Sequence, residues 1–310
     1  MQKIIGVLAI GVVAIVGAFL WHKKDVERQL ADRQQSVQTL SVVATFYPLE
    51  EFARSVGGGR ISVKSIVPAG AEPHEYEPSA QNILSSYESQ IFLLNGAGVD
   101  VWAEKIKPEL EKRGIKVIQM SQLLSPLSLA DEDGSHDPHF WLDPVIAKEE
   151  VNAIANALIE KDPAGAKEYG ERRDVTLERL DTLDKDYRFG LSSCQSHTVI
   201  TSHNAFSYLG KRYGFTSISI SGISPEAEPS PKRLAELAQT IRDKGIHDVF
   251  FETLVSPKVS ETLARETGAE TLVFNPLEGL TDEEKGRGEN YFSIMEENLK
   301  NLKRALQCQK

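Results

Sequence analysis

Residues 162–191, DPAGAKEYGERRDVTLERLDTLDKDYRFGL, contain the pattern that decides the fold. Asp162 followed by Pro163 is a typical helix start, and no glycine or proline interrupts the stretch between Gly170 and Gly190. Apolar side chains recur mostly every three or four residues, at Val175, Leu177, Leu180, Leu183, Tyr187 and Leu191. The spacing predicts one helix of about 28 residues and about 42 Å, at 1.5 Å per residue. Such a helix is too long for one small lobe and indicates a stiff link between two lobes.

Four short apolar segments precede this helix and four follow it. Each is rich in β-branched and aromatic residues and is followed by turn residues or a helical pattern. The alternation predicts an α/β fold of two lobes, each with a four-stranded, mainly parallel sheet and flanking helices. The predicted strands are 41–47, 61–67, 91–94, 116–119, 197–202, 216–220, 248–251 and 271–274. The predicted divisions are an N-terminal lobe at 40–161, the linking helix at 162–192 and a C-terminal lobe at 193–310.

The first residues predict where the protein resides. An unbroken apolar run extends from Ile4 to Trp21, close to the length that spans a bilayer. No small-residue cleavage site ends the run, and no cysteine lies near it for lipid attachment. We therefore expect residues 1–21 to be an uncleaved membrane anchor and residues 22–39 a polar tether, with the bulk outside the cytoplasm. Cleavage as a signal peptide, which would leave a secreted or periplasmic protein, is the alternative.

Composition excludes several classes of protein. The 310 residues include 35 basic and 45 acidic side chains, and a net charge of −10 argues against a nucleic-acid partner. Hydrophobic residues at 41% supply enough apolar surface for packed cores, which excludes a mostly disordered chain. The nucleotide-binding, serine-hydrolase and helical zinc-protease motifs are absent from the sequence. Two cysteines, Cys194 and Cys308, can form a disulfide in an oxidising compartment, with two unrelated thiols as the alternative.

Three histidines follow the carboxyl ends of predicted strands. His74 comes after the second strand, His139 after the fourth, and His203 directly after the fifth, where it opens a predicted helix at 204–213. Ligands of parallel α/β sheets bind at these ends, so histidines from both lobes would meet in a cleft between the lobes. Three neutral imidazoles form a good site for Zn²⁺, although a single loop histidine is more often a solvated surface residue.

A carboxylate is available as the fourth ligand that a tetrahedral ion needs. Glu278 is the first acidic residue after the last strand, and Gly279 beside it permits a tight turn. A surface carboxylate is the alternative. Glu252, at the end of the preceding strand, is a rival ligand or a partner that orients a histidine. The acidic stretch 131–136 could gather cations weakly, but a solvated loop is the favoured interpretation.

Five motifs between residues 40 and 310 carry a family resemblance. They are PHEYEP at 73–78, DPHFWL at 137–142, SHNAFSYL at 202–209, ISPEAEPS at 223–230 and NPLEGLT at 275–281. With them the chain resembles the metal-binding solute-binding proteins of ABC importers for zinc and manganese. The resemblance implies two lobes joined by one long helix, with the ion between them. It also implies the ligand set His74, His139, His203 and Glu278.

The same resemblance favours the zinc-type branch. Manganese-type relatives typically have Glu at the third ligand position and Asp at the fourth, whereas this chain has His203 and Glu278. Imidazole-rich sites also favour Zn²⁺ over Mn²⁺. The chain departs from many relatives in its short loop at 131–136, which is long and His-rich in them, and in lacking a lipid-attachment cysteine. Cys194 and Cys308 fit a disulfide expected in one branch of the family.

These features together predict a membrane-tethered, extracytoplasmic Zn²⁺-binding protein that delivers its ion to an ABC permease, acts as a monomer and catalyses no reaction. A zinc hydrolase with a His₃ site is one alternative, because three histidines and a water also form a catalytic arrangement. A manganese-binding member of the same family and an adhesin-like protein with structural zinc are the others. The ligand in the fourth position separates the hydrolase from the carrier.

Overall fold

The computed structural model describes residues 39–127, 129, 136–225 and 227–309. Residues 40–310 form one compact unit, distinct from residues 1–39. The predicted anchor at 1–21, residues 22–38 of the predicted tether and residues 131–135 of the acidic stretch lie outside the described residues. Within the described part, every helix is too short or too polar to cross a membrane.

Two four-stranded sheets have the same strand order, β2-β1-β3-β4 in the first and β6-β5-β7-β8 in the second. All pairings between neighbouring strands within the two sheets are parallel. The predicted α/β fold with two parallel sheets is therefore confirmed. The strands are β1 Leu40–Ala44, β2 Ile61–Ser65, β3 Ile91–Leu94, β4 Lys116–Gln119, β5 Thr198–Thr201, β6 Thr216–Ser219, β7 Asp248–Phe251 and β8 Glu270–Val273.

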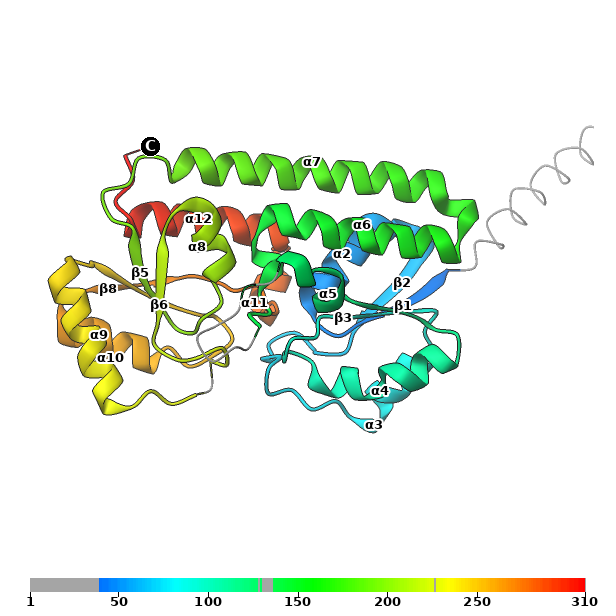
Figure 1. Cartoon of the computed structure of the whole chain (residues 1–310), viewed down its shortest axis with the longest axis horizontal. Coiled ribbons are helices and arrows are strands. Elements are labelled where there is room, and N and C mark those ends of the chain that lie inside the picture. Colours follow the sequence, from blue (N-terminus) through cyan, green and yellow to red (C-terminus); the bar gives the residue numbers. More distant parts are fainter. Residues whose placement is uncertain (1–38, 128, 130–135, 226, 310) are drawn as a thin grey trace, which may run out of the picture. The chain divides into compact units, whose positions relative to one another are not determined.

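Helices follow most strands and cover both faces of each sheet (Figure 1). In the first half they are α2 Tyr47–Gly57, α3 Ala80–Tyr87, α4 Val101–Lys112, α5 Met120–Leu123 and α6 Pro144–Lys161. The long helix is α7 Ala166–Gly190. In the second half they are α8 Ser207–Tyr213, α9 Pro231–Lys244, α10 Lys258–Thr267, α11 Asp282–Gly286 and α12 Tyr291–Ala305.

Alternate residues of the inner strands enter different cores. On β1, Val42 and Ala44 join the cluster that contains residues of α2 and α6, whereas Val43 joins the cluster that contains residues of α4. On β5, Val199 joins the first cluster and Ile200 packs with residues of α9 and α10. This alternation follows from the two-residue repeat of a strand, and it explains why both faces of each sheet are apolar.

One hydrophobic core extends through both lobes. The cluster that begins at β1 continues through α6 and α7 to α12 and the strands of the second sheet. Three fully buried aromatic residues, Trp141, Tyr187 and Tyr291, lie within it. The hydroxyl of Tyr291 donates to the carbonyl of Trp141 at 2.6 Å, and the hydroxyl of Tyr187 donates to the carbonyl of Met295 at 2.8 Å. The lobes are therefore joined by shared packing as well as by a helix.

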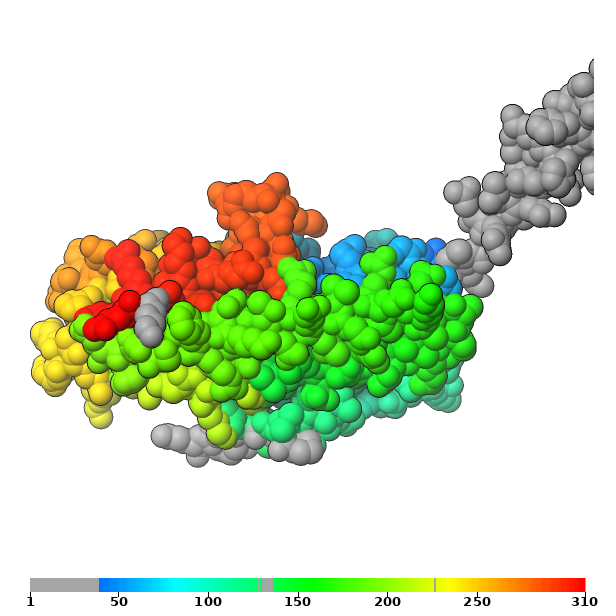
Figure 2. Space-filling model, turned by 90° about the horizontal axis from the view of Figure 1, so that it is seen from above, coloured from blue at the N-terminus to red at the C-terminus, as the bar shows by residue number. Residues whose placement is uncertain are grey.

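The helix α7 packs against α2, α6 and α12, and so reaches both lobes. Figure 2 shows it exposed along one face of the unit. Its 25 residues correspond to about 38 Å at 1.5 Å per residue. Leu180, Leu183 and Tyr187 are buried as the stripe predicted. Val175, however, is 59% exposed, and the buried position on that turn belongs to Thr176.

Asp162 precedes a helical turn as predicted, but this turn is not yet the α-helix. A 3-10 turn, Pro163–Gly165, comes first, and α7 begins at Ala166. Asp162 accepts no capping hydrogen bond from the helix amides. Its carboxylate instead accepts from the guanidinium of Arg60 at 2.8 Å and from the hydroxyl of Tyr169 at 2.8 Å. The side chain that looked like a helix cap therefore joins α7 to the end of the turn before β2.

Cys194 and Cys308 form a disulfide, as the sequence suggested. The bond connects the segment that follows α7 to the segment that follows α12, with a sequence separation of 114 residues. The backbone amide of Gln309 donates to the carbonyl of Ser193 at 3.1 Å beside it. The C-terminal end of the described chain is thereby attached to the start of the second lobe.

Removing this cross-link should destabilise the protein. A closed loop of this length contributes about 4–5 kcal/mol in the chain-entropy model, and measured values are typically about 2–4 kcal/mol. We expect the C194S/C308S double variant to lose roughly that much free energy of unfolding, measured by urea denaturation. The reduced wild-type protein should lose a similar amount. An unchanged unfolding midpoint in both samples would contradict the prediction.

Candidate metal centre

Four side chains from loops at the carboxyl ends of strands meet between the two sheets. His74 lies in the loop between β2 and α3, and His139 precedes the 3-10 turn Phe140–Leu142 after β4. His203 lies two residues after β5, and Glu278 lies in the loop between β8 and α11. The structure therefore brings together all four residues that the sequence proposed as ligands.

The helix that His203 was predicted to open begins later. The helix α8 starts at Ser207, not at Asn204, so His203 lies in a loop. The backbone amide of Asn204 donates to the carbonyl of Gly222 at 2.8 Å, in the loop after β6. This bond holds the chain out of the helix just after the histidine.

Four of the six separations between the candidate ligand atoms match those of a tetrahedral zinc site. Oε1 of Glu278 lies 3.1 Å from Nε2 of His74, 3.2 Å from Nε2 of His139 and 3.3 Å from Nε2 of His203. The Nε2 atoms of His139 and His203 are 3.2 Å apart. Corners of a regular tetrahedron at about 2.0–2.1 Å from its centre are about 3.3 Å apart. All four atoms lie within 4.8 Å of one another and form a group that could hold a metal ion.

The site is enclosed by protein. The side chains of His139 and His203 have no exposed surface, Glu278 is 1% exposed and His74 is 5% exposed. Four protein ligands fill a tetrahedron, whereas catalytic zinc sites keep one position for water or substrate. The arrangement is therefore suited to holding an ion and not to activating a water molecule.

Two carboxylates outside the ligand set orient two of the histidines. Oδ1 of Asp137 lies 2.8 Å from Nδ1 of His139 and accepts from its backbone amide at 2.9 Å. Oε1 of Glu252 lies 2.7 Å from Nδ1 of His203 and accepts from its backbone amide at 3.1 Å. Because a carboxylate only accepts, each Nδ1 carries the hydrogen, and Nε2 of the neutral ring is free to bind an ion.

The sequence had left two roles open for Glu252, and it had not singled out Asp137. The structure places Glu252 behind His203, outside the group of four. Asp137 stands two residues before His139 in the DPHFWL motif, and that spacing was the available signal. Among the described residues, no comparable partner contacts Nδ1 of His74. The first histidine is therefore held less firmly than the other two.

Opposite charges at the site stabilise one another and shift the pKa values of the histidines and of Glu278. Burial opposes protonation of His203, but the carboxylates of Glu252 and Glu278 raise its pKa well above the ordinary value. Burial likewise opposes protonation of His139, and hydrogen bonds to Asp137 and Glu278 raise its pKa. Burial would raise the pKa of Glu278, yet the three histidines hold it well below its usual range. An incoming cation must therefore displace protons from the imidazoles.

A further acidic side chain, Glu72, lies beside the site. Its burial, and next the negative charge of Glu278, raise the pKa of its carboxyl to about 8. Oε2 accepts from the backbone amide of Glu75 at 3.3 Å, whereas Oε1 is buried with no hydrogen-bond partner among the described residues. Glu72 is not among the site residues predicted from the sequence.

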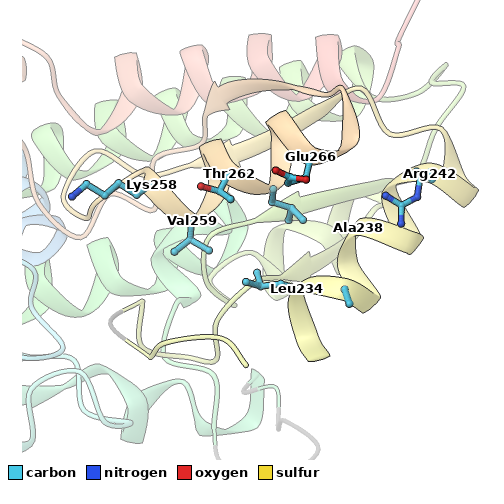
Figure 3. Close-up of a pocket in the computed structure, with 9 residues that line it drawn as sticks. Leu234, Ala238, Arg242, Lys258, Val259, Thr262 and Glu266 are labelled. Carbon is cyan, nitrogen blue, oxygen red and sulfur yellow. The ribbon is translucent and has the colours of Figure 1, made fainter. Parts of the chain in front are cut away.

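Three cavities of the described structure differ in their distance from the four candidate ligands. One of about 570 Å³ is lined by residues 278–280 together with residues of α2 and α11. Another of about 550 Å³ is lined by His136 and Asp137; His136 is the one described residue of the stretch 131–136. A mainly apolar groove of about 490 Å³ lies between α9 and α10 (Figure 3), and its lining includes none of the four ligand residues.

Comparison with known proteins gives consistent matches. The family model of the periplasmic zinc-uptake complex component A matches residues 42–305. The zinc-binding lipoprotein AdcA of Streptococcus pneumoniae is 38% identical over 286 residues, 88% of this chain and 57% of AdcA. The high-affinity zinc uptake system protein ZnuA of Bacillus subtilis is 33% identical over 279 residues, 86% of this chain and 88% of that protein.

A solved structure supports the fold at the same level of similarity. The Zn(II)-bound ZnuA-like domain of Streptococcus pneumoniae AdcA superposes with a TM-score of 0.77 at 38% identity. The match covers 86% of this chain and 99% of that domain. The chain thus spans less than two thirds of the full AdcA sequence and almost the whole of its ZnuA-like domain.

Replacing the carboxylates behind the histidines should weaken metal binding without abolishing it. We expect Asp137→Asn and Glu252→Gln each to lower Zn²⁺ affinity by about 10–100-fold, the usual effect of losing such a partner. Competition titration against a chelator of known affinity measures the change. The matched control is Glu261→Gln on the exposed face of α10, which should bind as the wild type does. Wild-type affinity in both test variants would contradict the orienting role.

Proposed function

Since this chain belongs to the family of periplasmic zinc-uptake complex components, we propose that it captures Zn²⁺ outside the cytoplasm and delivers it to an ABC permease. Two relatives, the zinc-binding lipoprotein AdcA and the high-affinity zinc uptake system protein ZnuA, support the proposal. The observation that carries it is the meeting of three imidazole nitrogens within 3.1–3.3 Å of one carboxylate oxygen, in a group that could hold a metal ion. Zinc is the cargo, and no reaction is catalysed.

In this proposal the ion bridges the two lobes. His74 and His139 bind it from loops of the first sheet, and His203 and Glu278 bind it from loops of the second. The three imidazoles favour Zn²⁺ over Mn²⁺, which prefers sites rich in oxygen ligands. Occupation of the fourth position by Glu278 disfavours the hydrolase alternative, because no coordination position is left for an activated water.

We also propose that the chain is divided into two lobes and a linking helix, as the sequence predicts. The lobes are 40–161 and 193–310, with the linking helix at 162–192. A membrane segment at 1–21 and a tether at 22–39 would hold a monomeric carrier close to its permease. Extracytoplasmic residence fits the disulfide, since such bonds persist in oxidising compartments.

Metal competition on the full chain, purified in mild detergent, tests the proposal. The protein is stripped of metal and then offered Zn²⁺ and Mn²⁺ together. We expect one tightly bound Zn²⁺ per chain, exclusion of Mn²⁺, and an unchanged circular dichroism spectrum in the stripped sample. Retention of Mn²⁺ would favour the manganese-binding alternative, and unfolding of the stripped protein would indicate structural zinc.

Substitution of a ligand tests the site itself. We expect His203→Ala to lower Zn²⁺ affinity by more than the roughly 100-fold that loss of an outer partner can cause, because a direct bond to the ion disappears. His247→Ala, at the amino end of β7, is the control and should leave affinity unchanged. Isothermal titration or chelator competition gives both values. Wild-type affinity in His203→Ala would remove this residue from the site.

Zinc affinity should fall as the pH falls. The pKa values of His139 and His203 are raised in the metal-free site, so a proton on either ring is held more tightly and competes with Zn²⁺. Below these raised pKa values, affinity should drop about tenfold per pH unit for each displaced proton. Calorimetry in buffers of different ionisation enthalpy counts the released protons. Affinity independent of pH between 5.5 and 7.5, with no proton release, is the contrary result.

A further inference from the structure

We propose that Glu284 is a positioning residue that keeps Glu278 at the ion by joining the two ends of the loop that carries it. This 275–281 loop connects β8 to α11, and Glu284 lies on α11. The inference rests on the proposed function, because it takes Glu278 to be a ligand of Zn²⁺.

One buried carboxylate reaches both ends of the 275–281 loop. Oε1 of Glu284 accepts from the side-chain amide of Asn275 at 3.0 Å. Oε2 accepts from the backbone amide of Thr281 at 2.8 Å and from its hydroxyl at 3.0 Å. Glu284 is 5% exposed, and α11 lies between the two sheets in Figure 1. The first and last residues of the loop are therefore fixed to the same side chain.

A helix cap accounts for the two contacts with Thr281 but not for the third, with Asn275. Thr281 and Glu284 form the reciprocal capping box of α11, in which the amide of Glu284 donates to the hydroxyl of Thr281 at 3.1 Å. A capping box uses the groups at the start of the helix alone. The bond from Glu284 to Asn275 crosses the loop and contributes nothing to the helix end. Its effect is to hold the segment on either side of Glu278.

The loop is held at further points by both lobes. The backbone amide of Asn275 donates to Oδ1 of Asn298 at 2.9 Å, and Nδ2 of Asn298 donates back to the carbonyl of Asn275 at 2.7 Å. From the first lobe, Nε1 of Trp141 donates to the carbonyl of Pro276 at 2.8 Å. The backbone amide of Gly70 donates to the carbonyl of Leu280 at 2.9 Å.

The residue directly before Glu278 shows why the loop needs these restraints. Leu277 has φ +59°, in the left-handed region that favours glycine, and its side chain is fully buried. Its amide donates to Oδ1 of Asn275 at 2.8 Å. A strained backbone of this kind persists only when its surroundings fix it, and such residues occur often at binding sites. Loss of the Glu284 contacts would allow Leu277 to relax and Glu278 to leave the three histidines.

The variant Glu284→Gln tests this role, because an amide has one acceptor oxygen and cannot serve both Asn275 and Thr281. In the full chain we expect Zn²⁺ affinity to fall at least tenfold, through faster dissociation measured by chelator competition in a stopped-flow instrument. Glu284→Asp has a shorter side chain but keeps the charge, so its Zn²⁺ affinity should lie between those of Glu284→Gln and the wild type. Glu283→Gln is the matched control on the same helix, since its exposed side chain pairs only with Arg287 among the described residues. It should stay within twofold of the wild type.

A double-mutant cycle separates positioning from a general effect on folding. If Glu284 acts through Glu278, then Glu284→Gln should change affinity little when Glu278 is already alanine. An equal loss in both backgrounds, or no loss in the single variant, would overturn the inference. Wild-type affinity in Glu278→Ala would instead overturn the ligand assignment of the proposed function. Thermal unfolding of the metal-free proteins identifies any variant that fails to fold, in which case Glu284→Asp carries the comparison.

Discussion

The contact of one carboxylate oxygen of Glu278 with the Nε2 atoms of three histidines is the interaction on which the rest of the arrangement depends. All four groups are nearly inaccessible to water, so the charges must compensate one another. With protons on the imidazoles they pair with Glu278, and a divalent cation at the same point would replace those protons. Asp137 and Glu252 extend the compensation outward by holding the far nitrogens of two rings. The negative charge at the site is thus balanced either by protons on the imidazoles or by a bound divalent cation.

Such a balance requires ligands from two sheets to be held at fixed positions. The common core through α6, α7 and α12 supplies this rigidity, because Trp141, Tyr187 and Tyr291 pack and hydrogen-bond across the junction. The two lobes therefore share one packed core at their junction. Among the described residues, His74 is the one candidate histidine whose Nδ1 has no carboxylate partner. Preorganisation of the other three ligands lowers the cost of binding the ion.

The sequence predicted the elements that depend on local pattern. The bounds of 91–94, 116–119 and 248–251 were correct, because short β-branched and aromatic segments ended in clear turn residues. The ligand candidates followed from the rule that parallel sheets bind at their carboxyl ends. The prediction of a strand through Tyr47 was too long, since Phe46 and Tyr47 continue the apolar pattern although the chain turns into α2. The roles of Asp162 and Glu284 could not be predicted, because Arg60 and Asn275 are brought near them only by folding. Asp137 stands two residues from His139, so its role was within reach of the sequence.

The two sheets share one strand order, so the chain resembles one structural unit that occurs twice. The two units are not independent, however, because they share a hydrophobic core. An isolated half, cut from the other at the long helix, would leave the aromatic junction facing water and would lose half of the residues that meet at Glu278. A fragment of that kind would be prone to aggregate, because large exposed apolar patches favour association. The two halves therefore cannot be exchanged or produced as independent modules, and any change at the junction must be matched on both sides.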